Sequence, residues 1–98
     1  MPVSILTSSR FRKLLLKLSS RQRGEVDLAI DALKGAFGTP HAHLGLGIRK
    51  LVGSLFELRI GLDLRILFWF EQGQVVLHFL GTHDDVRAFL KSRGRKLP

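Results

Sequence analysis

Apolar residues in the first third of the chain recur with the period of an α-helix. After the polar run 7–9, which suits a helix N-terminus, apolar positions share one face and predict a helix over about 9–18. A second apolar stripe, from Val26 to Phe37, predicts another helix that ends at the glycines near residue 38. The two helices form an αα-hairpin preceded by a short β-prone segment at 3–6.

From Ile48 to Gly81 the apolar period changes to two, which is the period of a β-strand. Segments 55–60, 64–70 and 75–81 alternate and are joined by short turns, so they predict an antiparallel meander. The turn positions predict four apolar pairs: Phe56 with Phe68, Leu58 with Ile66, Phe70 with Val75, and Phe68 with Leu77.

The same register places Arg59 directly opposite Arg65 on the other face of the sheet. Like charges in that position destabilise a strand pair, so the arrangement favours an anion bound between them. Two other interpretations stay open at this point. Glu57 lies on the same face and can neutralise one arginine, or both long side chains can extend into water.

The face that carries these arginines is also expected to hold an apolar patch. Alternation directs Val75, Leu77 and Phe79 to the core, and the remaining apolar residues are then expected to be half exposed and covered by a partner. Trp69 has a second interpretation, as a platform for an RNA base. The expected patch consists of Leu67, Trp69, Val76 and Leu80.

A last helix is predicted after Thr82, which has the spacing of a capping box with Asp85. His83, Arg87 and Lys91 recur every four residues and therefore line one side of it. The complete order predicts an α+β fold in a single domain, residues 1–98. An N-terminal strand and an αα-hairpin pack on an antiparallel meander, followed by a short C-terminal helix.

Charge narrows the classes of partner. The net charge of +8 is concentrated in residues 1–23 and 87–96, a distribution that favours nucleic acid or an acidic protein segment. The absence of cysteine excludes disulfides and thiolate chemistry. Nothing resembles a signal peptide or membrane span, so we expect a soluble, cytoplasmic protein. His41 and His43 lie in a glycine-rich loop without further ligands, and no metal site is expected.

Several motifs resemble, in order and spacing, those of the RelE/ParE toxin superfamily. They are the L-x-G step at 51–53, the E-L-R strand at 56–60 and the R-I-L-F strand at 64–68. The G-T-H-x-D segment at 81–85 is similar to that of the YafQ-type members. The resemblance covers about 40 residues of the second half. It implies a ribosome-dependent mRNA endoribonuclease that inhibits translation without a metal or other cofactor.

The resemblance also implies roles for individual residues. Arg65 matches the phosphate-stabilising arginine of the family, and His83 matches the histidine that transfers a proton. Arg59 stands where YafQ-type members have a functional histidine, which changes its expected role to that of a phosphate clamp. The sequence has no tyrosine, so members that use a late tyrosine are poor models. Supporting candidates are Arg87, Asp63 and Glu57, and candidate RNA-binding residues are Lys50, Trp69 and Lys91.

The implied partners are a cognate antitoxin, the ribosome and its mRNA, with DNA contacted only through the antitoxin complex and no membrane. Two other functions remain open. A ParE-like toxin has the same fold but poisons DNA gyrase and needs no catalytic histidine. A non-catalytic basic module would bind nucleic acid without cutting it.

Overall fold

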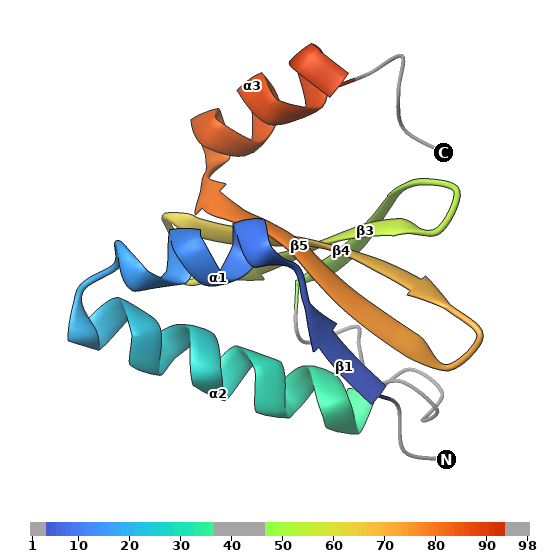
Figure 1. Cartoon of the computed structure of the whole chain (residues 1–98), viewed down its shortest axis with the longest axis horizontal. Coiled ribbons are helices and arrows are strands. Elements are labelled where there is room, and N and C mark those ends of the chain that lie inside the picture. The colour runs from blue at the N-terminus through green and yellow to red at the C-terminus, as the bar shows by residue number, and fades with distance from the viewer. Residues whose placement is uncertain (1–3, 37–46, 94–98) are drawn as a thin grey trace.

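A five-stranded sheet with helices on both faces forms the molecule (Figure 1). The computed structural model describes residues 4–36 and 47–93. The strand order is β1-β5-β4-β3-β2, and β1 runs parallel to β5 while the other neighbours are antiparallel. The elements are β1 (Ser4–Thr7), α1 (Ser9–Leu16), α2 (Ser20–Ala36), β2 (Ile48–Val52), β3 (Leu55–Ile60), β4 (Leu64–Glu71), β5 (Gln74–Thr82) and α3 (His83–Arg93).

This architecture confirms the predicted α+β class and its order of elements. The structure adds two features to the prediction. Residues 48–52 form a strand of their own at one edge of the sheet, and the N-terminal strand closes the other edge by pairing with β5. The chain therefore crosses from one edge of the sheet to the other through the helical hairpin (Figure 1).

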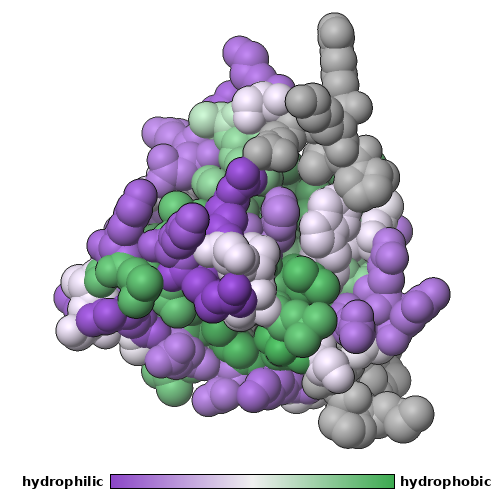
Figure 2. Space-filling model, in the orientation of Figure 1, coloured by the Kyte–Doolittle hydropathy of each residue, from purple (hydrophilic) through white to green (hydrophobic). Residues whose placement is uncertain are grey.

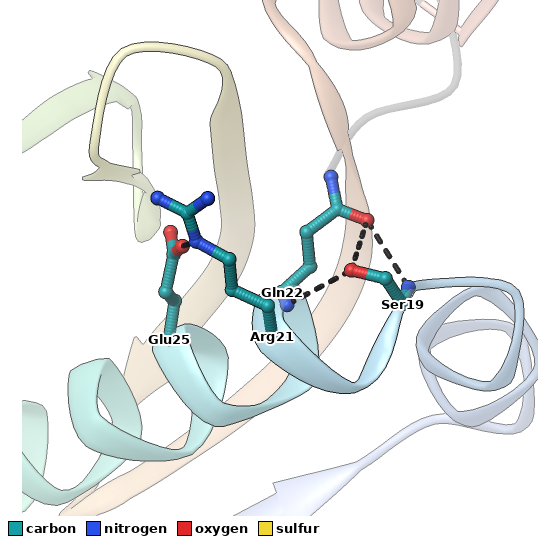
Figure 3. A network of polar contacts seen from close by, with 4 residues as sticks. All are labelled: Ser19, Arg21, Gln22 and Glu25. Carbon is teal, nitrogen blue, oxygen red and sulfur yellow. Dashed lines mark hydrogen bonds and ion pairs between the residues drawn. The ribbon is translucent and has the colours of Figure 1, made fainter.

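Side-chain caps define where the first two helices begin. Ser8 caps α1 by accepting a hydrogen bond from the backbone of the first turn. At the start of α2, Ser19 Oγ accepts from the backbone N–H of Gln22 at 3.1 Å, and Gln22 Oε1 accepts from the backbone N–H of Ser19 at 3.1 Å (Figure 3). Arg21 and Glu25 add an ion pair one turn apart. These local bonds satisfy N–H groups that the helix itself leaves unpaired.

Two tight turns set the register of the meander, and both lie where the sequence predicts them. Gln72 and Gly73 have φ values of 51° and 75°, the left-handed conformation that a two-residue hairpin loop requires. Ile60 pairs with Leu64, so the β3–β4 turn is centred on Leu62. All four predicted apolar pairs are confirmed.

The main core lies between the sheet and the hairpin of α1 and α2. Phe11 of α1 and Val26 and Leu33 of α2 are buried against one face of the sheet. Phe68 is buried in this layer and stacks on Phe56, with ring centroids 5.5 Å apart. The other buried residues of the core are Leu58, Ile60, Leu64, Ile66, Val75, Leu77 and Leu80.

Helix α3 covers part of the opposite face and corrects the predicted apolar patch. Val86 packs against Leu55 and Leu67, and the rings of Phe79 and Phe89 stack at 4.2 Å. Leu67 is fully buried by this packing. The prediction of a half-exposed patch is therefore wrong for Leu67, which the chain's own C-terminal helix covers, and for Leu80, which is buried in the main core, whereas Trp69 and Val76 are half buried as predicted.

A β-bulge in β5 explains the other error. Leu67 pairs with Phe79 whereas Phe68 pairs with Leu77, so His78 is an extra residue opposite that step. The bulge shifts the alternation by one position. Phe79 consequently points to the α3 side, and Leu80 joins the main core, the reverse of the prediction.

The surface is mixed in character. Figure 2 shows hydrophilic side chains over much of the visible face, around apolar atoms in the region of α2 and β1. Among the described residues, no helix has the length and apolar composition needed to cross a membrane. The predicted loop at 38–47, with His41 and His43, falls almost entirely outside the described residues.

We expect Phe68→Ala to lower the free energy of unfolding by about 3–5 kcal/mol, because it removes a buried ring from the centre of the main core. Chemical denaturation measures this loss. Leu28→Ala is the control, since Leu28 is 72% exposed and its truncation should change stability by no more than ~0.5 kcal/mol. Equal losses in the two variants would contradict the assignment of the core.

Candidate anion-binding and proton-transfer site

Arg59 and Arg65 lie directly opposite each other on β3 and β4. Alternation places both side chains on the face of the sheet that α3 partly covers. Directly opposed residues in antiparallel strands have Cβ atoms about 5 Å apart, so two cations here repel each other. The predicted opposition is thus confirmed, and a nearby negative charge is needed to offset the repulsion between the two arginines.

Glu57 supplies part of that charge from within the sheet. Arg65 donates from Nη1 to Glu57 Oε1 at 3.2 Å, and the side chains of Arg65 and Glu57 are only 13% and 6% exposed. Arg49, which pairs with Glu57 across β2 and β3, places Nη2 3.6 Å from the same oxygen. The ion pair that the sequence left as one alternative is therefore present: Glu57 pairs with Arg65, one of the two opposed arginines, and also with Arg49.

A cavity of about 370 Å³ opens at this cluster. Gly47 forms one wall, where its carbonyl accepts from the backbone N–H of Arg59 at 3.1 Å. With φ at +75° and Arg59 Cβ 3.3 Å from where a Cβ would be, this position favours glycine. The described residues that line the cavity are Gly47, Ile48, Arg49, Glu57, Arg59 and Arg65.

The charges around the cavity do not balance. Three arginines and one glutamate line it, so its walls carry an excess of positive charge. Arg65 Nε is buried and has no hydrogen-bond partner among the described residues. A buried donor without an acceptor is unfavourable, and an arginine cluster with free donors matches the geometry of a phosphate. The arrangement can therefore bind an anion of that kind.

The pairing of β4 with β5 relates His83 to this cluster. Gly81 pairs with Arg65, and His83 follows it by two residues as the first residue of α3. The predicted capping box is confirmed: Thr82 Oγ1 accepts from the backbone N–H of Asp85 at 3.1 Å, and Asp85 Oδ2 accepts from that of Thr82 at 3.0 Å. This box fixes the start of the helix, and His83 is exposed there.

Gly81 makes this placement possible. A Cβ at this position would lie 2.7 Å from Asp85 Cβ, closer than such atoms can approach. A larger residue would therefore push the first turn of α3, and His83 with it, away from the end of β5. Strand pairing thus relates His83 to Arg65 through Gly81, but His83 does not line the arginine cavity, and no bond joins it to the arginines among the described residues.

The remaining predicted residues are spread over four places. Arg87 and Lys91 are exposed on α3 and line a shallow hollow along that helix. Trp69 is half buried beneath α3, with its ring 6.4 Å from that of His78. Asp63 lines a different cavity, of about 610 Å³, between the β3–β4 turn and the start of α2.

Lys50 pairs with Phe56, whose ring belongs to the opposite face, so Lys50 is not directed to the arginines.

Arg49 belongs to the cluster, and sequence reasoning missed it. Its strand, β2, was not assigned a register, so the choice between Arg49 and Lys50 could not be made from alternation. The available signal was the apolar residue Ile48, from which alternation can start. Packing Ile48 on the main core directs Arg49 to the face of Glu57.

No family model matches the sequence, and no curated protein matches it. Solved structures are similar in fold. One chain of the RelB–RelE antitoxin–toxin complex from Methanococcus jannaschii matches with a TM-score of 0.68 and 16% identity, over 86% of this chain and 96% of that chain. One chain of the DinJ–YafQ toxin–antitoxin complex from E. coli matches with a TM-score of 0.66 and 14% identity, over 88% and 98%.

A third similar structure is the toxin–antitoxin complex RelBE2 from Mycobacterium tuberculosis, with a TM-score of 0.59 and 20% identity over 85% of this chain and 100% of that chain. In all three, the match spans nearly the whole of the solved chain. The chain therefore has the RelE-type toxin fold, as the resemblance of its motifs predicts.

Glu57→Ala should lower the free energy of unfolding by about 3 kcal/mol, because it leaves the largely buried Arg65 without its counter-charge. Chemical denaturation measures the change. Asp31→Ala removes the same charge from an exposed position on α2 and should change stability by no more than ~0.5 kcal/mol. A Glu57→Ala variant as stable as the control would show that the ion pair contributes nothing.

Proposed function

We propose that this chain, which has the RelE-type toxin fold, is the toxin of a type II toxin–antitoxin system and cuts mRNA on the ribosome. The observation that carries the proposal is the opposition of Arg59 and Arg65 at a cavity with excess positive charge. A phosphodiester is an anion whose oxygens match the planar, multiple donors of arginine. The net charge of +8 supports nucleic acid as its source.

The proposed reaction is an internal transfer at the RNA phosphate. The 2′-hydroxyl loses its proton and attacks the adjacent phosphorus, forming a new P–O bond. The bond from phosphorus to the 5′-oxygen of the next nucleotide breaks, and that oxygen takes up a proton. The products are a 2′,3′-cyclic phosphate and a 5′-hydroxyl, and the step consumes no cofactor.

Each proposed catalytic residue has one task in this reaction. Arg65 and Arg59 stabilise the charge that builds up on the phosphate oxygens in the transition state. His83 transfers a proton, since imidazole both accepts and donates protons near neutral pH. The exposure of His83 at the start of α3 leaves it accessible to RNA.

The other predicted residues take supporting roles in the proposal. Arg87 and Lys91, on the same helix as His83, contact RNA phosphates on either side of the cut. Trp69 is half buried beneath α3 and can stack on a base only with its exposed part. Asp63 and Lys50 lie away from the arginine cluster, so we assign them to contacts outside the reacting phosphate.

An antitoxin completes the proposal. The similar structures from M. jannaschii, E. coli and M. tuberculosis are toxin–antitoxin complexes. The basic surface of this chain complements an acidic partner, which would reach the same arginines that bind RNA. Toxin and antitoxin would meet in the cytoplasm, where ribosomes translate, and DNA would be contacted only through their complex.

Mapping of mRNA 5′ ends after induction of the protein in cells tests the proposal. Cuts in frame with translated codons are expected, together with growth arrest. His83→Ala should lower the cleavage rate by about 10²–10⁴-fold, because it removes the proton-transfer group. Lys34→Ala, an exposed substitution on α2, which packs on the other face of the sheet, is the control and should retain most of the cutting.

Two outcomes would overturn the nuclease proposal. Unchanged growth arrest in His83→Ala cells with intact mRNA would favour a gyrase-poisoning toxin of the ParE type, which needs no catalytic histidine. Binding of RNA without cyclic-phosphate ends, even with purified ribosomes, would indicate that the protein is a non-catalytic nucleic-acid-binding module.

A further inference from the structure

Glu57 is the one carboxylate among the described residues that line the arginine cavity. Its side chain is 6% exposed, and one of its oxygens, Oε1, lies within 3.6 Å of guanidinium nitrogens of two different arginines. A charged group is kept out of water only when it is paired. An acid buried beside a proposed phosphate site also repels the substrate, so its position requires a reason.

The two arginines bound to Glu57 are held very differently. Arg65 is 13% exposed and donates to Oε1 at 3.2 Å, whereas Arg49 is 68% exposed and lies at 3.6 Å. Arg65 is thus enclosed and fixed, while Arg49 sits at the sheet edge in water. An exposed ion pair of the second kind contributes little and exchanges readily.

Arg65 keeps donors that Glu57 does not use. Nη1 donates to the carboxylate, and the buried Nε has no acceptor among the described residues. A donor that is already out of water loses no further hydration when an anion reaches it, so it gains the full benefit of the new hydrogen bond. Under the proposed function, the orientation of these donors of Arg65 affects how well a phosphate in the cavity is bound.

We infer that Glu57 is a positioning residue, which holds one end of Arg65 so that its remaining donors face a phosphate in the cavity. Arg49 lies farther from the same oxygen and is exposed, so it can turn toward the substrate and add a third cationic contact. This role rests on the proposed function, because it assigns Glu57 a part in RNA cleavage. It does not require Glu57 to touch the substrate.

NMR of the arginine Nε–H groups tests the inference without any cleavage. In the folded wild-type protein the Arg65 Nε–H should exchange slowly with water and shift when inorganic phosphate is added. In Glu57→Gln the protection should be lost and the phosphate response of that signal should disappear. Asp31→Asn, which removes the same charge from an exposed site, should leave both unchanged.

A second variant, Glu57→Asp, tests the inference if Glu57→Gln does not fold. Glu57→Asp keeps the charge but shortens the side chain by one methylene, so it should also release Arg65 and abolish the phosphate response. An Arg65 signal that keeps its protection and its phosphate shift in either folded variant would overturn the inference.

Kinetics on ribosomes separate positioning from other roles. Glu57→Gln removes a repelling charge, so it should bind mRNA at least as tightly as wild type while turnover falls about tenfold, as expected for one charge-assisted hydrogen bond. Tighter binding with unchanged turnover would show that Glu57 only offsets positive charge, and this would overturn the inference. A turnover loss with an unaltered Arg65 signal would instead make Glu57 a proton acceptor.

The two proposals fail in distinguishable ways. If the wild-type protein cuts no RNA, the nuclease proposal fails while the NMR comparison still decides whether Glu57 orients Arg65. If the protein cuts RNA but the Arg65 signal is indifferent to Glu57, only the positioning role is lost.

Discussion

The repulsion between Arg59 and Arg65 is the interaction on which the rest of the site depends. The pairing of β3 with β4 places the two residues directly opposite each other, and the buried Glu57 offsets only part of their charge. A surface of this kind is less stable empty than occupied, because an anion between the guanidinium groups turns repulsion into attraction. Binding of an anion is therefore expected to increase the stability of the folded protein.

The two layers of the molecule serve this arrangement in different ways. The hairpin of α1 and α2 buries one face of the sheet and fixes the strands. Helix α3 packs on part of the other face and leaves the arginine cluster open beside it. Because the capping box and Gly81 fix the start of α3, His83 is placed near the strand end that carries Arg65. The proposed phosphate clamp and the proposed proton-transfer group thus come from adjacent elements.

Alternation and turn chemistry predicted the β3–β4 register and the arginine pair, because a slip of one residue would expose the whole core face of a strand. They failed at His78, where a bulge reverses the orientation of Phe79 and Leu80 without any distinctive local sequence. They also failed at Arg49, whose orientation depends on how the edge strand packs. The proposed role of His83 followed from resemblance and not from any pattern of spacing.

A double-mutant cycle between Arg59→Gln and Arg65→Gln tests the central claim most directly, because it isolates the free energy between the two side chains. Unfolding would be measured in chloride and in phosphate buffers of equal ionic strength. We predict a repulsive coupling of about 0.5 kcal/mol in chloride that vanishes or becomes attractive in phosphate. The same coupling in both buffers would contradict an anion site between the arginines.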